Sequence, residues 1–191
     1  MTPKTGRTAA ISGDDGVAAQ ALLAEMVAEW RAGGARIAGV TAEGHGLPGR
    51  TCGAGFLREI ASGKARTIYL DAPSSSTSCH LDAAGVADAG RAIVEEIPTS
   101  DLVILNKFGK LEAMGAGLAA AFAAAIAVDK PLLTTVSEKH RNGWSSFAPG
   151  AIFLTAEKSA LQDWWQSVRS VRPRQEELQL LRVSQQSAGV R

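Results

Sequence analysis

The stretch Ser100–Glu112, SDLVILNKFGKLE, decides the fold of this chain. Its apolar part, Asp101–Leu105, is rich in β-forming residues and is bounded by polar ones, which is typical of a fully buried parallel strand. The polar cluster Asn106–Glu112 follows directly. Because ligands of open α/β sheets bind beyond the carboxyl ends of the strands, this cluster is a candidate binding site.

Apolar runs with strand character alternate with segments of helical periodicity on both sides of this stretch. The expected strands are Thr8–Ser12, Arg36–Thr41, Gly55–Ile60, Ala65–Leu70, Asp101–Leu105, Pro131–Val136 and Ala151–Leu154. The expected helices are Val17–Arg31, Leu81–Ile97, Gly115–Val128 and Ser159–Arg169. Gly55–Ile60 and Ala65–Leu70 flank a turn and should form a hairpin-like pair. Glu43–Gly55 is expected to be a loop, and whether Gly44–Gly55 is a mobile lid stays open. The alternation predicts an α/β fold with a mostly parallel sheet.

Length and composition narrow the class of protein. A chain of 191 residues with 46% hydrophobic and 20% charged residues is expected to form one globular domain over residues 1–170, with a polar, flexible tail over 171–191. A net charge of +1 gives no reason to expect nucleic-acid binding. Two cysteines make no disulfide framework, and we expect no signal peptide, no membrane insertion and a cytoplasmic location. The Ala-rich helix could pack on the sheet or on a second subunit, so a homo-oligomer stays open.

Three polar clusters follow expected strands and should meet at one edge of the sheet. They are Ser12–Gly16, Asn106–Glu112 and Ser137–Arg141. Their shared topological position, rather than any single cluster, predicts a site.

The order of these segments resembles the small nucleoside-triphosphatase family of P-loop proteins first described from thermophiles. More closely, it is similar to an uncharacterised bacterial family known only as a domain of unknown function. The resemblance runs from about Thr8 to Phe153 and rests on AAISGDDG, IAGV, GFLREI, RTIYLD, DLVILNKFGKLE and KPLLTTVSEKHR. It implies a P-loop-like three-layer sandwich that handles a nucleotide or a phosphate-like group.

The chain departs from that pattern at its two phosphate-site motifs. A working P-loop reads G-x-x-x-x-G-K-[ST], but no lysine and no Ser/Thr follow Gly16, and Asp14 and Asp15 stand where phosphates would be bound. The acid of the second motif is replaced by Asn106, while Glu112 keeps the family's later acid. The resemblance therefore implies a degenerate P-loop, in which two carboxylates about 4 Å apart would cost about 4 kcal/mol at a surface-like dielectric and disfavour a polyphosphate unless a cation compensates.

Each candidate residue has an ordinary structural interpretation beside the functional one. Asp14 and Asp15 can cap a helix, and the lysines of the second cluster can be solvated. Alternatively, loop amides bind an anion and Lys107 replaces the missing P-loop lysine. The candidate anion- or nucleotide-binding residues are Ser12, Gly13, Asp14, Asp15, Gly16, Asn106, Lys107, Lys110, Glu112 and Arg141.

The Ser/Thr run after Pro73 is a secondary candidate. Ser75, Ser76, Thr77 and Ser78 could form an oxyanion-binding nest or a polar linker. The adjacent pair Cys79–His80 is a weak metal signal without further spaced ligands, so no metal site is predicted.

Three functions remain open. The favoured one is binding of a nucleotide or a phosphate-like oxyanion at the strand ends, and the family resemblance associates such proteins with molybdate uptake or molybdenum metabolism. The second is a Mg²⁺-dependent nucleoside triphosphatase in which Lys107 replaces the P-loop lysine and Asp14, Asp15 or Glu112 holds the metal; Mg²⁺ is expected only in that case. The third is a regulatory or scaffold protein without a ligand.

Overall fold

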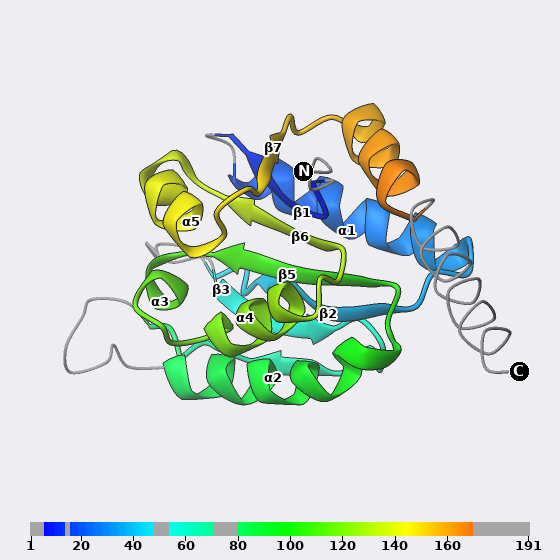
Figure 1. The fold of residues 1–191 in the computed structure, drawn as a ribbon. Coiled ribbons are helices and arrows are strands. Elements are labelled where there is room, and N and C mark those ends of the chain that lie inside the picture. The colour runs from blue at the N-terminus through cyan, green and yellow to red at the C-terminus, as the bar shows by residue number, and fades with distance from the viewer. Residues whose placement is uncertain (1–5, 14–15, 48–53, 71–79, 170–191) are drawn as a thin grey trace, which may run out of the picture.

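A seven-stranded sheet carries helices on both faces in this computed structural model, which describes residues 6–13, 16–47, 54–70 and 80–169 (Figure 1). The strands are β1 (Thr8–Ser12), β2 (Ile37–Gly44), β3 (Ala54–Glu59), β4 (Ala65–Thr67), β5 (Leu102–Phe108), β6 (Leu132–Val136) and β7 (Ile152–Leu154). They lie in the order β4-β3-β2-β5-β6-β1-β7. The strand of the stretch quoted first, β5, is therefore at the centre of the sheet. The predicted tail, 171–191, lies outside the described residues.

The sheet is mostly parallel, as predicted. β1 pairs parallel with β6 and β7, and β5 pairs parallel with β2 and β6. β3 pairs antiparallel with both β2 and β4, which confirms the predicted hairpin. The carboxyl ends of β1, β2, β5, β6 and β7 consequently share one edge of the sheet, called the carboxyl edge below. The fold is an α/β, P-loop-like sandwich.

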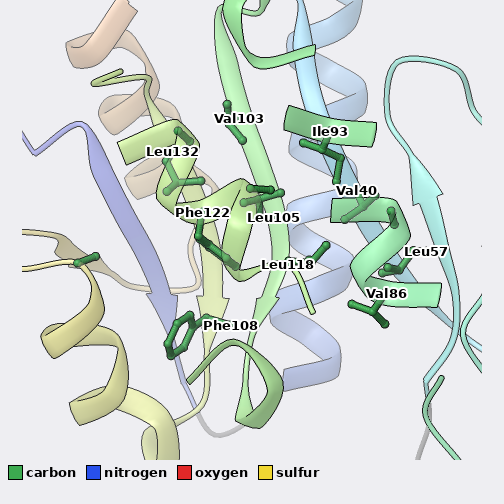
Figure 2. Close-up of a cluster of buried hydrophobic side chains, with 14 of the residues drawn as sticks. Val40, Leu57, Val86, Ile93, Val103, Leu105, Phe108, Leu118, Phe122 and Leu132 are labelled. Atoms are coloured by element: carbon green, nitrogen blue, oxygen red, sulfur yellow. The ribbon is translucent and has the colours of Figure 1, made fainter. Parts of the chain in front are cut away.

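Alternation along β5 divides the core into two parts. Leu102 and Ile104 face α1 (Gly16–Ala32) and the C-terminal helix over residues 158–169; the buried residues on this face form the α1-side core. Val103 and Leu105 face α2 (Ala83–Glu96) and α4 (Ala119–Ala127), whose buried residues form the α2-side core (Figure 2). Because all four β5 side chains are fully buried, each stabilises the fold by about 1.5–3 kcal/mol.

The two helices of the α1-side core are held to each other by their tryptophans. The Trp30 and Trp165 ring centroids are 5.7 Å apart, and Trp30 Nε1 donates to Gln162 Oε1 at 2.7 Å. Trp164 and Trp165 are both buried, as expected for packing residues. No helix of the described residues is both long and apolar enough to cross a bilayer.

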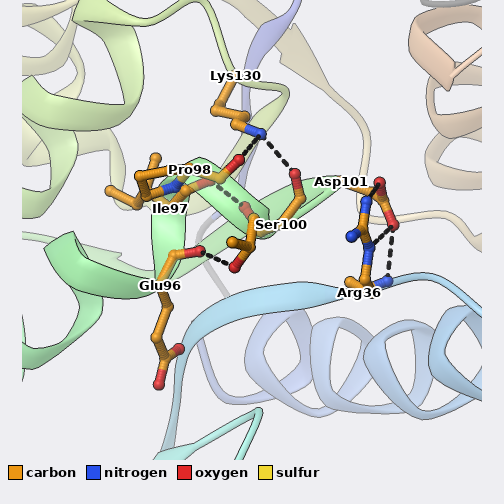
Figure 3. A network of polar contacts seen from close by, with 8 residues as sticks. Arg36, Glu96, Ile97, Pro98, Ser100, Asp101 and Lys130 are labelled. Atoms are coloured by element: carbon orange, nitrogen blue, oxygen red, sulfur yellow. Dashed lines mark hydrogen bonds and ion pairs between the residues drawn. The ribbon is translucent and has the colours of Figure 1, made fainter.

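The opposite edge of the sheet, where β2, β5 and β6 begin, is fastened by polar contacts (Figure 3). Arg36 Nη2 and Nε donate to Asp101 Oδ1 and Oδ2 at 2.8 and 3.1 Å. Lys130 Nζ donates to the carbonyl oxygens of Pro98 and Ser100 at 3.0 and 2.5 Å. These contacts join the segments that precede the three strands, so the register of the sheet is set at this end.

Several predicted boundaries are wrong, and tertiary pairing explains why. β2 continues to Gly44 and β3 begins at Ala54, because Ala42 and Glu43 pair with Leu57 and Phe56 across the antiparallel ladder. The loop expected over Glu43–Gly55 is therefore too long at both ends. β5 continues to Phe108, with a shift of register against β6 after Leu105. Asn106 and Lys107 therefore lie within the strand instead of after it.

Two short helices were not predicted, and one predicted helix begins late. α3 (Lys110–Ala113) follows β5, and α5 (Arg141–Phe147) follows a 3₁₀ turn over Glu138–His140. The Ala-rich helix α4 begins at Ala119 instead of Gly115. Gly115 and Gly117 adopt φ angles of +76° and +59°, which a continuing helix does not permit.

Candidate functional site

The loop after β1 opens the carboxyl edge. Ser12 ends β1 in register with Val136 of β6, and α1 begins at Gly16. A Cβ atom built on Gly13 or on Gly16 would meet nothing within 4 Å, so the described part of this loop borders open space. The 17-residue helix α1 begins at this loop, so the positive end of its dipole lies at the carboxyl edge. Asp14 and Asp15 lie outside the described residues and remain predictions.

A row of buried polar side chains crosses the sheet beside this loop. Thr41 of β2, Asn106 of β5 and Thr135 of β6 are 9%, 1% and 5% exposed. Thr41 follows Val40, which pairs with Leu105, and Thr135 pairs with Ile11 of the α1-side core. The row therefore lies on the α1 face of the sheet, at the level where β1 reaches Ser12. Buried polar residues at the end of otherwise apolar strands indicate a built site more than a packing need.

Asn106 is held by one hydrogen bond. Thr135 Oγ1 donates to Asn106 Oδ1 at 2.9 Å, whereas Asn106 Nδ2 has no hydrogen-bond partner among the described residues. A buried amide N–H left unpaired costs about 1–3 kcal/mol, so this atom has a strong preference for an acceptor. The end of the central strand thus offers a hydrogen-bond donor that has no partner among the described residues.

Cationic side chains gather where β5 and β6 end. Lys107 is exposed on β5, and Lys139 and Arg141 follow β6. Burial and the charges of Lys139 and Lys107 lower the pKa of half-buried His140 below its usual 6.5, and Glu112 partly opposes them. Both lysines therefore act on the same imidazole at the carboxyl edge, although they are 32 residues apart in sequence.

Glu112 is buried and bound by the backbone. Its Oε2 accepts from the Gly109 N–H and its Oε1 accepts from the Leu118 N–H, both at 3.0 Å. The first contact caps α3, and a Cβ at Gly109 would lie 3.6 Å from Glu112 Oε2 and 4.0 Å from Lys107 Cε. Glu112 thus shapes the turn that follows β5, and the Lys107 stem lies beside it. A direct role for Glu112 or the exposed Lys110 in ligand binding stays a prediction.

Arg141 lies toward the β7 side of the carboxyl edge. Its Nη1 pairs with Glu138 Oε1 at 3.1 Å, and its guanidinium carbon is 3.8 Å from the centroid of the Phe153 ring on β7. Stacking holds the planar guanidinium in one orientation, which suits bidentate recognition of an anion.

The β3–β4 side of the sheet carries a stack of rings instead of a metal site. His45 and Tyr69 have ring centroids 4.8 Å apart, and Tyr69 stacks on His80 at 5.3 Å. His80 Nδ1 lies 2.7 Å from the Leu70 carbonyl oxygen. Within the described ranges no three His, Cys, Asp or Glu residues are grouped to hold a metal ion. Cys79 and the secondary candidates Ser75, Ser76, Thr77 and Ser78 lie outside those ranges.

A surface depression of about 410 Å³ lies at the other edge of the sheet, away from these residues. Trp30, Asp101 and Trp165 are among its lining residues, and none of the candidate residues is. Charged side chains such as Arg7 and Glu29 line it together with the two tryptophans. The chemistry of the carboxyl edge is therefore the better guide to function.

The structure brings together some of the predicted residues and adds one that was missed. β1 and β5 lie on either side of β6, and the residues at or just after their carboxyl ends are Ser12, Gly13, Gly16, Asn106 and Lys107. Thr135, which orients Asn106, was not predicted. The available signal was the pair Thr134–Thr135 inside a fully buried strand, although β-branched threonine is also an ordinary strand residue.

Comparisons with known proteins agree with this architecture. A family model described as "Protein of unknown function (DUF2478)" matches residues 8–164. The chain is 36% identical over 152 residues to the "Molybdenum import ATP-binding protein ModC 2" of Bradyrhizobium diazoefficiens. The aligned region covers 78% of this chain and 17% of that protein. The chain thus spans about a sixth of the length of this relative. No solved structure matches. The likeness to thermophile-type nucleoside triphosphatases stays a prediction.

Proposed function

This chain belongs to the DUF2478 family, and we propose that it binds a small, multiply charged oxyanion at the carboxyl edge of its sheet, either free or as the terminal phosphate of a nucleotide. The observation that carries this proposal is that Lys107, Lys139 and Arg141 lie on or follow β5 and β6, whose carboxyl ends share one edge of the sheet with the open loop at Gly13 and Gly16. Cations that share an edge of the sheet with the start of a long helix are suited to an anion.

The identity of the relative supports a molybdenum-related ligand. The name of this relative includes both molybdenum import and ATP binding. Molybdate and the terminal phosphate of ATP are both tetrahedral and carry about two negative charges, so one set of donors can serve either. We therefore infer an accessory role in molybdate uptake or molybdenum metabolism, with the oxyanion bound by Lys107, Arg141 and loop amides.

A Mg²⁺-dependent nucleoside triphosphatase is the second candidate function, because the name of the relative includes ATP binding. In that case Lys107 would replace the P-loop lysine, and Asp14, Asp15 or Glu112 would hold the metal. Glu112 already accepts two backbone hydrogen bonds, and Asn106 stands where the metal-binding acid is expected. Both features favour binding without hydrolysis.

The test is isothermal titration calorimetry of the purified chain with sodium molybdate, tungstate, sulfate, phosphate and ATP. We expect measurable affinity for at least one of these anions. Lys107→Met should weaken it by about tenfold to a hundredfold, the range for one hydrogen bond to a charged group. Lys64→Met is the matched control, since it removes the same charge from the turn between β3 and β4 at the opposite edge of the sheet.

The outcomes separate the candidate functions. Binding that depends on Lys107 and is indifferent to Lys64 supports the proposal. Release of phosphate from ATP that needs Mg²⁺ and is lost in Lys107→Met would replace it with the hydrolase. A folded chain that binds none of the five anions would reject both and leave a scaffold role.

A further inference from the structure

We propose that Asn106 donates its side-chain N–H directly to an oxygen of the bound anion, and that the anion consequently binds without Mg²⁺. This inference rests on the oxyanion-binding function proposed above. It names Asn106 as the group that selects the metal-free anion over its Mg²⁺ complex. An amide at the end of the central strand, in place of the acid expected there, would thus make this an anion site instead of a metal–nucleotide site.

The position of Asn106 supports the first part. Its partner Thr135 is in register with Ile11, so the Asn106 amide lies one residue short of Ser12 and on the same face of the sheet as α1. Gly13 and Gly16 follow, with open space where side chains would stand. An anion bound on this face, at the end of β1 and β6, would therefore lie on the same side of the sheet as this amide.

The hydrogen bond of Thr135 fixes which end of the amide is available. A hydroxyl has one hydrogen, and Thr135 Oγ1 donates it to Asn106 Oδ1 at 2.9 Å. The oxygen end of the amide is thereby engaged, and Nδ2, which carries two hydrogens, is the end left without a partner among the described residues. A side chain that is 1% exposed and whose amide nitrogen has no hydrogen-bond partner among the described residues is complementary to an anion.

The same arrangement disfavours a magnesium ion. Mg²⁺ prefers carboxylate and phosphate oxygens in near-octahedral geometry, and an N–H donor in that place would repel it. Among the described acids, Glu112 already accepts hydrogen bonds from the Gly109 and Leu118 amides, and Asp14 and Asp15 lie outside the described residues. The local positive charge is supplied by Lys107 and Lys139 instead.

The experiment measures dissociation constants for sodium molybdate and for ATP, each in EDTA and in excess MgCl₂, with the wild type and Asn106→Asp. The variant is isosteric and replaces two N–H donors by a carboxylate. For the wild type we expect the same molybdate affinity in both media and ATP binding at least as tight in EDTA as in MgCl₂. Asn106→Asp should weaken both ligands in EDTA by about tenfold to a hundredfold, and MgCl₂ should restore only ATP.

Thr135 provides a second test that does not depend on a new charge. As a positioning residue, it should act through the hydroxyl alone: Thr135→Val should weaken molybdate binding, whereas Thr135→Ser should restore the wild-type affinity. Circular dichroism and the urea midpoint of every variant verify that the fold is retained. If Thr135→Val and Thr135→Ser bind equally, the orienting role is rejected.

The two proposals fail separately. If the wild type binds none of the anions, the oxyanion function itself is wrong. If the wild type binds molybdate or ATP and Asn106→Asp binds them with unchanged affinity and unchanged Mg²⁺ dependence, the function stands and the role of Asn106 is overturned. A wild type whose ATP affinity requires Mg²⁺ likewise overturns the metal-free site.

Discussion

Glu112 and Leu118 are joined by a hydrogen bond from the Leu118 backbone N–H to Glu112 Oε1, 3.0 Å long and buried. The contact spans the turn between α3 and α4, and the other carboxylate oxygen caps the start of α3 at Gly109. One acidic side chain thus fixes both ends of the connection that follows β5. The geometry of the carboxyl edge depends on it even without any contact between Glu112 and a ligand.

Glu112→Ala should destabilise the chain strongly, because two buried N–H groups lose their acceptor at about 1–3 kcal/mol each. Urea unfolding followed by circular dichroism measures the change in the free energy of unfolding. Glu138→Ala is the comparison: it removes an exposed acid paired with Arg141, and its expected effect is below about 1 kcal/mol. Equal losses in the two variants would show that the buried amides do not depend on Glu112.

His140 should make stability depend on pH in a defined direction. Burial, followed by the charges of Lys139 and Lys107, lowers the pKa of His140 in the folded chain below 6.5. The unfolded chain therefore binds this proton more readily, so the free energy of unfolding falls as pH drops from about 6.5 towards the folded pKa. The contribution of His140 to stability is fully present at pH values above the pKa of this residue in the unfolded chain. His140→Gln should flatten the difference between pH 7.5 and pH 5; an unchanged pH profile would contradict this assignment.

A bound oxyanion should raise the pKa of His140, since it places negative charge beside the lysines that lower it. An NMR titration of the imidazole with and without saturating sodium molybdate measures this shift. Reciprocity then requires that molybdate bind more tightly as pH falls through the same range. Lys107→Met in the ligand-free chain should also raise the pKa. If molybdate binds and the imidazole titration does not move, the anion is held elsewhere.

Gly39 should tolerate no side chain. It lies in β2 with a φ angle of +124°, and a Cβ there would stand 1.8 Å from the backbone oxygen of Ile104 in β5. Gly39→Ala should therefore cost more than about 3 kcal/mol or prevent folding, because backbone cannot move aside as a side chain can.

Gly143→Ala is the control for that substitution. Gly143 lies inside α5, and its Cβ would meet Ala113 Cβ and Phe108 Cε1 at ordinary distances of 3.7 and 3.8 Å. Alanine is favoured over glycine in a helix by about 1 kcal/mol, so the thermal midpoint should rise. A loss of stability at Gly143 similar to that at Gly39 would contradict the assigned geometry of both positions.

The sheet was largely predictable because buried parallel strands are continuous apolar runs. The runs that became β1, β5, β6 and β7 were each located from that signal. The far end of β2 was missed because its pairing with β3 is antiparallel and includes the polar residue Glu43. The helices α3 and α5 were missed because a carboxylate cap and aromatic packing stabilise them, and neither has a periodic pattern long enough to detect.

The candidate site was predictable by residue type but not by contact. Asn106 and Lys107 were singled out because they depart from the pattern of related hydrolases. Their partners Thr135 and His140 follow β6 or lie within it, and only the pairing of β6 with β5 brings them into reach. Sequence spacing carries no information on which strand is the neighbour of which.

The place of β1 in the sheet has a consequence for how the chain acquires its structure. Among the described strands β1 comes first along the chain, yet its two neighbours in the sheet, β6 and β7, come last. Until about 120 further residues have emerged, β1 has no strand to pair with, since Thr8 pairs with Leu132. Such long-range pairing carries a large loop-closure entropy and predicts slow folding with a late, concerted step. An apolar strand must stay free of aggregation during that delay, and the proposed anion site, which needs β1, β5 and β6 together, forms only afterwards.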